Sequence, residues 1–379
     1  MSDPSPELTA FRERVAEVGA ATLNGLRALE VVARHLHPKS LPTLREQLVP
    51  LRDRLAEAHA PLLELPPPEG GEGLRDALAA GAGSALSALE GFCTDDGAAG
   101  PAGVPRILEA MRDACRAQER LYPLRFALPP LGTLYAEEPW HPRLHELDPE
   151  PPPGVSPGLY NGGEGRNREV RGGFVFYLPE TTDGKTPLPL VVALHGGYGH
   201  GADFLWTWLR EARSRRFMLL APTSRSTTWS LQAPAAAGKA LASMVAFLGE
   251  RFPVDPTRVL LTGLSDGATF SLLAGLAEDA PYTALAPVSG VLHPLNMAAG
   301  NLARAADRPI YLVHGAQDWM FPVALARMAR DELEKAGARL VYREIEDLSH
   351  TYPREENARI LEWFDPSLAL PTGDASGPS

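Results

Sequence analysis

The chain has 379 residues, which is longer than the usual single domain and favours two domains. Hydrophobic residues make up 44% and charged residues 22%, a balance typical of a folded globular protein rather than a disordered one. The formal net charge is -11 and no cluster of Lys and Arg interrupts it, so nucleic-acid and anionic-membrane partners are disfavoured.

The sequence shows no signal for a membrane, for export or for a metal. No uninterrupted apolar segment approaches the roughly 18 residues of a membrane span. The first residues, MSDPSPE, lack the basic start and apolar core of a secretory signal. Cys93 and Cys115 are too few for a disulfide framework and too far apart for a metal knuckle. We therefore expect a cytoplasmic protein with no membrane contact, no metal and no organic cofactor.

Residues 1–127 are predicted to form a helical bundle domain. Ala, Leu, Glu and Arg dominate, and apolar residues recur at three- and four-residue spacing without strand-like alternation. The expected helices are 7–36, 42–65, 73–92 and 104–121, the third weakened by internal glycines that each cost about 1 kcal/mol. Their apolar stripes fit three roles: a lid, a surface for homodimerisation, or a docking module for a partner.

Two segments lack any sustained period. Residues 128–167 are rich in Pro and Gly and are predicted to be a linker or an extended strap. Residues 367–379 are predicted to be a disordered tail.

Residues 168–366 alternate between strand-like and helix-like patterns. Most of the strands are short continuous apolar runs, as expected of parallel strands covered by helices on both faces. The prediction is an open, mostly parallel α/β sheet, whose ligands bind beyond the carboxyl ends of the strands. The expected strands are 172–179, 188–197, 216–222, 258–263, 283–290, 308–315 and 339–346. The expected helices are 202–215, 235–252, 268–276, 323–336 and 354–364.

A serine between two glycines follows one of these strands, in the stretch RVLLTGLSDGATF. A bare Gly-x-Ser-x-Gly pattern is weak, but here it has the strand-turn-helix context that gives it meaning. Gly263 and Gly267 allow strand and helix to approach closely, and the tight turn exposes the hydroxyl of Ser265 at the edge of the sheet. Ser265 is therefore the candidate nucleophile.

A serine nucleophile needs a base, and the base needs an orienting acid. His350 follows the last expected strand, and Asp318 lies three residues past the end of the strand before it. The order Ser265, Asp318, His350 is the one that this architecture imposes on a catalytic triad. Asp347 is the nearest rival for the acid, but it lies too close to His350 in sequence to replace Asp318 comfortably.

The reaction also requires hydrogen-bond donors for an oxyanion. The motif LHGGYGHGADF places small residues at the end of a buried strand, so the N–H of Gly197 is one expected donor, with Tyr198 as the alternative. The N–H of Asp266, directly after the serine, is the other. His195 and His314 are interpreted as structural residues that hold their loops.

Residues 168–364 resemble the α/β-hydrolase superfamily, through LHGGYGHGADF, DPTRVLLTGLSDGA, VHGAQDWMFP and the LSH that ends at His350. Within it, the chain is most similar to phospholipase/carboxylesterases, dienelactone hydrolases and polyhydroxybutyrate depolymerase-like proteins. The resemblance implies an esterase that acts on a small-molecule ester through an acyl-enzyme. Three other enzymes stay open on the same triad: a thioesterase, a polyester depolymerase or a peptidase. A non-catalytic binding protein is a further alternative.

Substrate contacts are less constrained by sequence than the triad. Trp229, His293 and Trp319 each lie in a loop after an expected strand. Aromatic and imidazole side chains in such loops line ligand sites or pack in the core. We expect these three to contact substrate.

Overall fold

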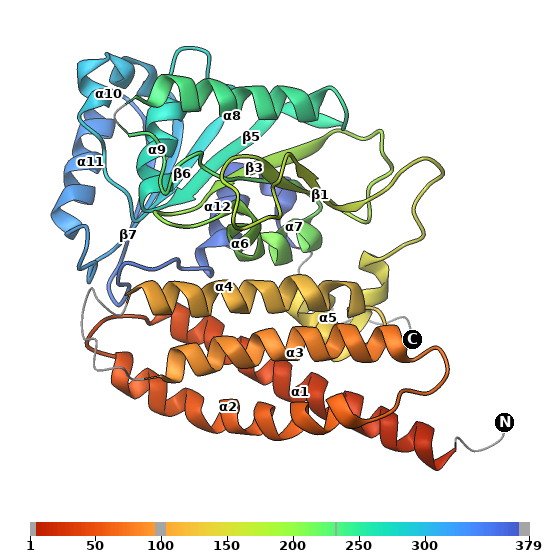
Figure 1. Cartoon of the computed structure of the whole chain (residues 1–379). Helices are drawn as coiled ribbons and strands as arrows, with labels where there is room; N and C mark the ends of the chain where they lie inside the picture. The colour runs from red at the N-terminus through yellow and green to blue at the C-terminus, as the bar shows by residue number, and fades with distance from the viewer. Residues whose placement is uncertain (1–4, 95–103, 232, 371–379) are drawn as a thin grey trace, which may run out of the picture. The chain divides into compact units, whose positions relative to one another are not determined.

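The computed structural model describes residues 5–94, 104–231 and 233–370. The chain divides into two compact units, Met1–Leu144 and His145–Ser379 (Figure 1). The boundary between the units falls within the Pro- and Gly-rich segment 128–167. The tail that we expected to be disordered begins at residue 367; Pro366–Leu368 form a 3-10 turn, and residues 371–379 lie outside the described part of the chain.

The first unit contains the four helices expected from the apolar periodicity. They are α1 (Pro6–Arg34), α2 (Leu41–Glu64), α3 (Glu72–Cys93) and α4 (Val104–Leu121). The Ser5 hydroxyl oxygen caps α1 by accepting a hydrogen bond from the N–H of Leu8 at 3.2 Å. Short helical turns follow at Tyr122–Leu124, Pro129–Gly132, Thr133–Tyr135 and Glu138–Leu147. The segment after residue 127 therefore has more local structure than its composition indicates.

The glycines of α3 have a packing role that the propensity scale does not capture. A Cβ at Gly81 would lie 2.5 Å from the Cγ and Cδ2 atoms of Leu121 on α4, and Leu121 is fully buried. Small residues continue along this helix at Ala82, Ala85 and Ala88, which are also fully buried. The glycine thus lets two helices approach closely, and this packing offsets its intrinsic cost in a helix.

The second unit contains a single sheet that positions the candidate site. In the described part of the chain its strand order is β1-β2-β4-β3-β5-β6-β7-β8. The strands β3 to β8 pair in parallel, whereas β1 and β2 are antiparallel to their neighbours. Their bounds are β1 Gly158–Gly162, β2 Phe174–Leu178, β3 Leu188–Leu194, β4 Met218–Pro222, β5 Val254–Leu264, β6 Ala284–Val288, β7 Pro309–Gly315 and β8 Arg339–Ile345. The predicted mostly parallel α/β sheet is confirmed.

Helices cover both faces of this sheet (Figure 1). On one side lie α8 (Pro234–Gly249), α9 (Asp266–Gly275) and α11 (Val323–Lys335). On the other lie α6 (Gly201–Phe204), α7 (Leu209–Arg215) and α12 (Glu356–Phe364), where Arg215 forms an ion pair with Glu362 at 3.0 Å. The core cluster of this unit joins strand residues such as Leu261 to helix residues such as Leu241 and Phe270.

One local expectation was wrong in detail. The helix expected over 202–215 is divided into α6 and α7 by a 3-10 turn at Leu205–Thr207, after which α7 begins at Leu209. Strand β1, Gly158–Gly162, lies in the segment expected to be a linker or an extended strap. Its sequence GLYNG has few β-formers, so pairing with β2 rather than propensity makes it a strand.

No helix in the described residues combines the length and the apolar character needed to cross a membrane.

The packing role of Gly81 predicts opposite effects for two Gly→Ala changes in the helical unit. Gly81→Ala should lower the free energy of unfolding by about 1–3 kcal/mol, because the new methyl group overlaps Leu121. Gly19→Ala in α1, where a Cβ meets no atom within 4 Å, should raise it by up to about 1 kcal/mol. Urea unfolding followed by circular dichroism measures both. Equal effects of the two changes would contradict this account of Gly81.

Candidate active site

The turn from β5 to α9 holds Ser265 in a strained conformation. Its φ is 56° and its ψ is -118°, in a region that non-glycine residues rarely adopt. Its N–H donates to the carbonyl of Val288 at 2.9 Å, which ties the turn to β6. A Cβ at Gly263 would lie 2.6 Å from the carbonyl carbon of Gly267, so a side chain at Gly263 would clash with the turn. The expected strand-turn-helix geometry is present.

Three side chains from three loops form one hydrogen-bonded chain. The Oγ of Ser265 lies 2.9 Å from Nε2 of His350, and Nδ1 of His350 lies 2.7 Å from Oδ2 of Asp318. Ser265 is 8% exposed and the Asp318 side chain is fully buried. The rival carboxylate, Asp347, is exposed. The structure thus brings together the three residues that the chain order singled out.

The Asp318 carboxylate is fixed on both oxygens. Oδ1 accepts hydrogen bonds from the N–H groups of Met320 at 2.9 Å and Phe321 at 2.7 Å. The fully buried His314 donates from Nε2 to the Phe321 carbonyl at 2.8 Å, and this nitrogen lies 3.5 Å from Oδ2 of Asp318. Burial lowers the pKa of His314, so its neutral form is favoured. His314 therefore supports the acid turn, as its interpretation as a structural residue required.

The loop after β3 lies against the serine. A Cβ at Gly196 would lie 3.5 Å from Cβ of Ser265. In the described part of the chain, the N–H of Gly197 has no protein acceptor. Asp266 is the first residue of α9, and the N–H groups of a helix's first turn have no acceptor within the helix. The N–H of Tyr198, in contrast, donates to the carbonyl of Thr227 at 2.6 Å. The alternative donor Tyr198 is thus already engaged, which corrects that part of the expectation.

The side chain of His195 stabilises this loop through two hydrogen bonds to the backbone. Its Nδ1 donates to the Gly196 carbonyl at 2.6 Å, and its Nε2 accepts from the N–H of Ser224 at 3.1 Å. Trp229 donates from Nε1 to the His195 carbonyl at 2.8 Å and stacks on Phe270 at 5.2 Å between ring centroids. Trp229 is 4% exposed and belongs to the core cluster, which corrects the expectation that its ring contacts substrate.

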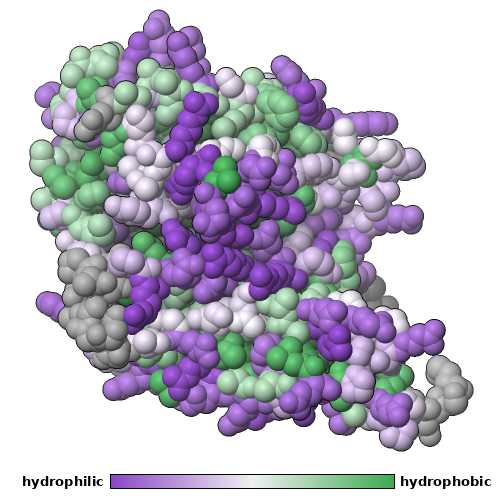
Figure 2. Space-filling view, viewed as in Figure 1, coloured by the Kyte–Doolittle hydropathy of each residue, from purple (hydrophilic) through white to green (hydrophobic). Residues whose placement is uncertain are grey.

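Trp319 is the first residue of an exposed apolar strip that follows the acid. Trp319 and Met320 are 41% and 49% exposed, and Leu325 and Met328 on the first turns of α11 are 38% and 63% exposed. Residues 325 and 328 share one helix face because they are three apart. Figure 2 shows hydrophobic side chains gathered over α10 (Leu295–Ala298) and α11. His293, half-buried before α10, accepts from the N–H of Leu295 at 3.3 Å.

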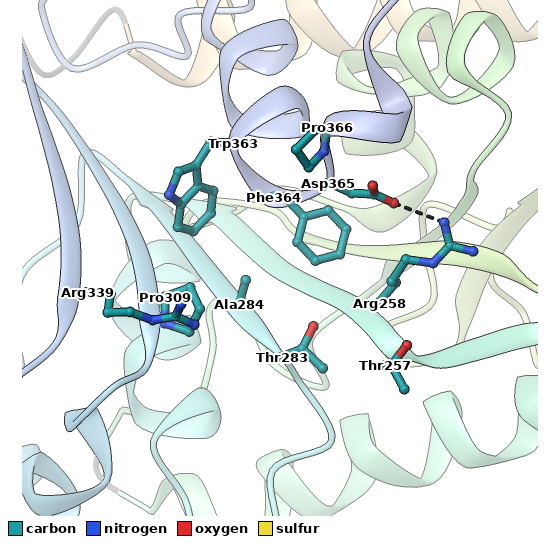
Figure 3. Close-up of a pocket in the computed structure, with 10 residues that line it drawn as sticks. All are labelled: Thr257, Arg258, Thr283, Ala284, Pro309, Arg339, Trp363, Phe364, Asp365 and Pro366. Atoms are coloured by element: carbon teal, nitrogen blue, oxygen red, sulfur yellow. Dashed lines mark hydrogen bonds and ion pairs between the residues drawn. The ribbon is translucent and has the colours of Figure 1, made fainter.

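A hollow of about 420 Å³ lies elsewhere in this unit (Figure 3). Thr257 and Arg258 line it from the first half of β5, whereas Ser265 follows the carboxyl end of that strand. Arg258 within it is paired with Asp365 at 2.9 Å, as the dashed line in Figure 3 marks. It therefore lies at the opposite edge of the sheet from the Ser265–His350–Asp318 chain.

No three His, Cys, Asp or Glu side chains in residues 5–94, 104–231 and 233–370 are grouped so that they could hold a metal ion.

Comparison with known proteins identifies the family that this site resembles. Residues 237–366 match the family model described as phospholipase/carboxylesterase, a stretch that contains Ser265, Asp318 and His350. The expected resemblance to the α/β-hydrolase superfamily is confirmed, and the match supports a carboxylic ester hydrolase. The helical unit lies outside the matched residues. No curated protein sequence matches the chain.

Several solved structures are similar to part of the chain. A thermostable esterase is 21% identical with a TM-score of 0.44, over 54% of this chain and 61% of the esterase. An acetyl xylan esterase from Aspergillus awamori is 16% identical with a TM-score of 0.43, over 55% of this chain and 98% of the esterase. Dipeptidyl peptidase 4 from Porphyromonas gingivalis is 14% identical with a TM-score of 0.45, over 56% of this chain and 36% of the peptidase.

The buried His200 of the loop after β3 predicts a pH dependence of stability. Its Nε2 donates to the Val170 carbonyl at 3.2 Å, Nδ1 accepts from the N–H of Ala202 at 3.1 Å, and burial lowers its pKa. In the unfolded chain the pKa of a histidine is about 6.5. As the pH falls below that value, the unfolded state binds a proton that the folded state does not, so stability falls.

His200→Gln should remove this contribution. Between pH 6.5 and pH 5, the loss of unfolding free energy should be shallower in the variant by up to about 1.4 kcal/mol per pH unit. Urea unfolding at several pH values measures the slope, whatever the absolute stability of the variant. Parallel curves for wild type and variant would contradict the assignment of a depressed pKa to His200.

Proposed function

We propose that the second unit hydrolyses carboxylic esters with Ser265 as nucleophile, His350 as general base and Asp318 as the orienting acid. The observation that carries the proposal is the hydrogen-bonded chain from Ser265 through His350 to Asp318, at 2.9 Å and 2.7 Å. A serine hydroxyl is a weak nucleophile until a base accepts its proton, and this arrangement supplies the base. The family match over residues 237–366 supports the same reaction class.

In the first half-reaction, the Oγ of Ser265 attacks the carbonyl carbon of the ester and its proton passes to Nε2 of His350. The carbonyl oxygen becomes an oxyanion, for which the N–H groups of Gly197 and Asp266 are the proposed donors. One such donor is worth about 3 kcal/mol of transition-state stabilisation. The intermediate collapses, the bond to the alcohol oxygen breaks, and His350 returns the proton to the leaving alcohol.

The second half-reaction repeats these steps with water. His350 accepts a proton from a water molecule as its oxygen attacks the acyl-serine carbonyl carbon. Collapse of this second intermediate releases the carboxylic acid, and His350 returns the proton to Oγ of Ser265. No metal or organic cofactor is required by this sequence of steps.

Asp318 fixes the tautomer of His350. With Nδ1 donating to Oδ2 of Asp318, Nε2 is left unprotonated and faces Ser265. The ring of Phe321 meets that of His350 edge-on at 5.2 Å and restricts its rotation. The buried carboxylate also stabilises the imidazolium that forms when the proton moves.

The apolar strip of Trp319, Met320, Leu325 and Met328 is the proposed contact for the apolar part of the substrate. Its position supports the proposal, because Trp319 and Met320 lie between Asp318 and Phe321, whose ring meets that of His350 at 5.2 Å. His293 is proposed to line the same site from the loop after β6. A longer acyl chain covers more of the strip and gains more from leaving water.

Ser265→Ala should fold normally and lose nearly all hydrolysis of p-nitrophenyl esters. His350→Ala should lose a comparable amount, because nucleophile and base act as a unit. Asp318→Asn should reduce kcat by roughly 10³- to 10⁴-fold, since the amide stabilises the wrong tautomer of His350. Release of nitrophenol from acetyl, butyryl and longer esters measures each effect.

The matched control for these variants is Asp347→Asn, which removes the nearest alternative carboxylate from an exposed position. It should retain wild-type turnover. Comparable hydrolysis by wild type, Ser265→Ala and His350→Ala would contradict the assignment of Ser265 as nucleophile and His350 as general base. A loss in Asp347→Asn with activity retained in Asp318→Asn would transfer the acid role to Asp347.

Trp319→Gln should lower kcat/KM for a dodecanoyl ester about tenfold more than for an acetyl ester, because only the long chain reaches the strip. Phe247→Gln is the control, since Phe247 is 40% exposed but lies on α8. The ratio of the two kcat/KM values, measured below the micelle concentration of the longer ester, is the readout. An equal loss for both esters would refute a chain contact at Trp319.

A further inference from the structure

The carboxylate of Asp266 is a charged group that the proposed mechanism leaves without a role. Asp266 is the first residue of α9, directly after the proposed nucleophile, and its backbone N–H is a proposed oxyanion donor. A negative charge next to a developing oxyanion opposes that oxyanion. A role in substrate choice would explain its presence there, and such a role rests on the proposed esterase function.

The carboxylate lies against the loop that carries the other proposed donor. A Cβ at Gly197 would lie 2.8 Å from Oδ2 of Asp266. This oxygen therefore occupies the space into which a side chain at residue 197 would project. The hydroxyl of Thr228 donates a hydrogen bond to the same oxygen. Asp266 is only partly buried, so the group remains accessible to a ligand.

The Asp266 carboxylate has no ion pair in the described part of the chain; the Arg171 guanidinium near these loops is bound instead to the carbonyls of Gly199 and Ser226. Thr228 is the carboxylate's hydrogen-bond partner there, and no Lys, Arg or His side chain forms an ion pair with it. The N-terminal dipole of α9 favours a negative charge at this position without neutralising it. Because Gly197 is a proposed donor to the oxyanion, a carboxylate against this glycine is positioned to act on the groups attached to the carbon that Ser265 attacks.

An aromatic residue lies beside the same glycine. Tyr198 follows Gly197 directly, is 64% exposed, and has φ 61°, an uncommon conformation for a bulky residue. Its N–H is tied to the Thr227 carbonyl at 2.6 Å, which holds the residue in this conformation next to Thr228. A carboxylate and an exposed aromatic ring are the two groups that bind organic cations most readily in proteins.

We propose that Asp266, assisted by Tyr198, selects esters that carry a cationic group close to the scissile carbonyl and rejects esters with an anionic group there. The cation is a protonated or quaternary amine of the acyl or alcohol part. Asp266 is thus a specificity residue that contacts substrate through its side chain, while its N–H serves the oxyanion. An anionic group in the same place would be repelled by both the Asp266 carboxylate and the oxyanion.

Three p-nitrophenyl esters of similar size test the charge preference. They are the ester of 4-(trimethylammonio)butyrate, its neutral isostere with a tert-butyl group in place of the trimethylammonium, and the monoester of glutarate. We expect wild type to prefer the cationic ester over the neutral one by about tenfold in kcat/KM, and the neutral over the anionic by a similar factor. Both preferences should decrease as ionic strength rises.

Asp266→Asn should bring the cationic-to-neutral ratio close to one, because the amide keeps the shape and removes the charge. The ratio within one variant is the readout, so a change in overall rate from a disturbed oxyanion site does not affect it. Glu278→Gln is the matched control: it removes the same charge from an 83% exposed side chain beyond the other end of α9, about 15 Å away. Its ratio should remain that of wild type.

Tyr198→Leu should lower the cationic preference severalfold while the net charge is unchanged. A wild-type ratio near one, or a ratio that Asp266→Asn leaves unchanged, overturns the inference while Ser265-dependent hydrolysis of the neutral ester keeps the proposed function intact. Equal loss of the preference in Glu278→Gln also overturns it, since the effect would then come from net charge. Failure of wild type to hydrolyse any of the three esters overturns both proposals.

Discussion

The close approach of β5 and α9 is the constraint on which the site depends. Without side chains at Gly263 and Gly267, the chain reverses within one residue and holds Ser265 at φ 56°. The same approach fixes the loop after β3, because a Cβ at Gly267 would lie 2.5 Å from the carbonyl oxygens of Leu194 and His195. One contact therefore sets the positions of the proposed nucleophile and of the loop that bears the proposed oxyanion donor.

The acid and the base reach the serine because parallel strands end at the same edge of the sheet. The register of β7 with β8 aligns Gly315 with Ile345, and the loops after these two strands carry Asp318 and His350. The buried Asp318 carboxylate is stable there because two backbone N–H groups and His350 satisfy its oxygens. Its geometry is thus fixed by the backbone of its own turn and leaves one oxygen for the histidine.

His195 and His314 are structural residues whose positions in the sequence resemble those of catalytic residues. His195 follows β3 directly, His314 is the penultimate residue of β7, and both precede glycine, as a reacting histidine could. In the structure each of them hydrogen-bonds to a backbone carbonyl, Gly196 for the first and Phe321 for the second. Only His350, among the described residues, has a ring that joins a serine to a carboxylate. Residue type and strand-end position are therefore not sufficient to separate support from chemistry.

The sequence by itself determined the helical first region, every central strand and the grouping of Ser265, Asp318 and His350, because apolar periodicity and strand-end spacing are local properties. Only the tertiary structure decided that Trp229 packs in the core, that the N–H of Tyr198 is already bonded to Thr227, and that GLYNG is a strand. It also placed the Asp266 carboxylate against Gly197. Each of these depends on a contact between segments far apart in the chain, and no local pattern encodes which backbone group a distant loop will present.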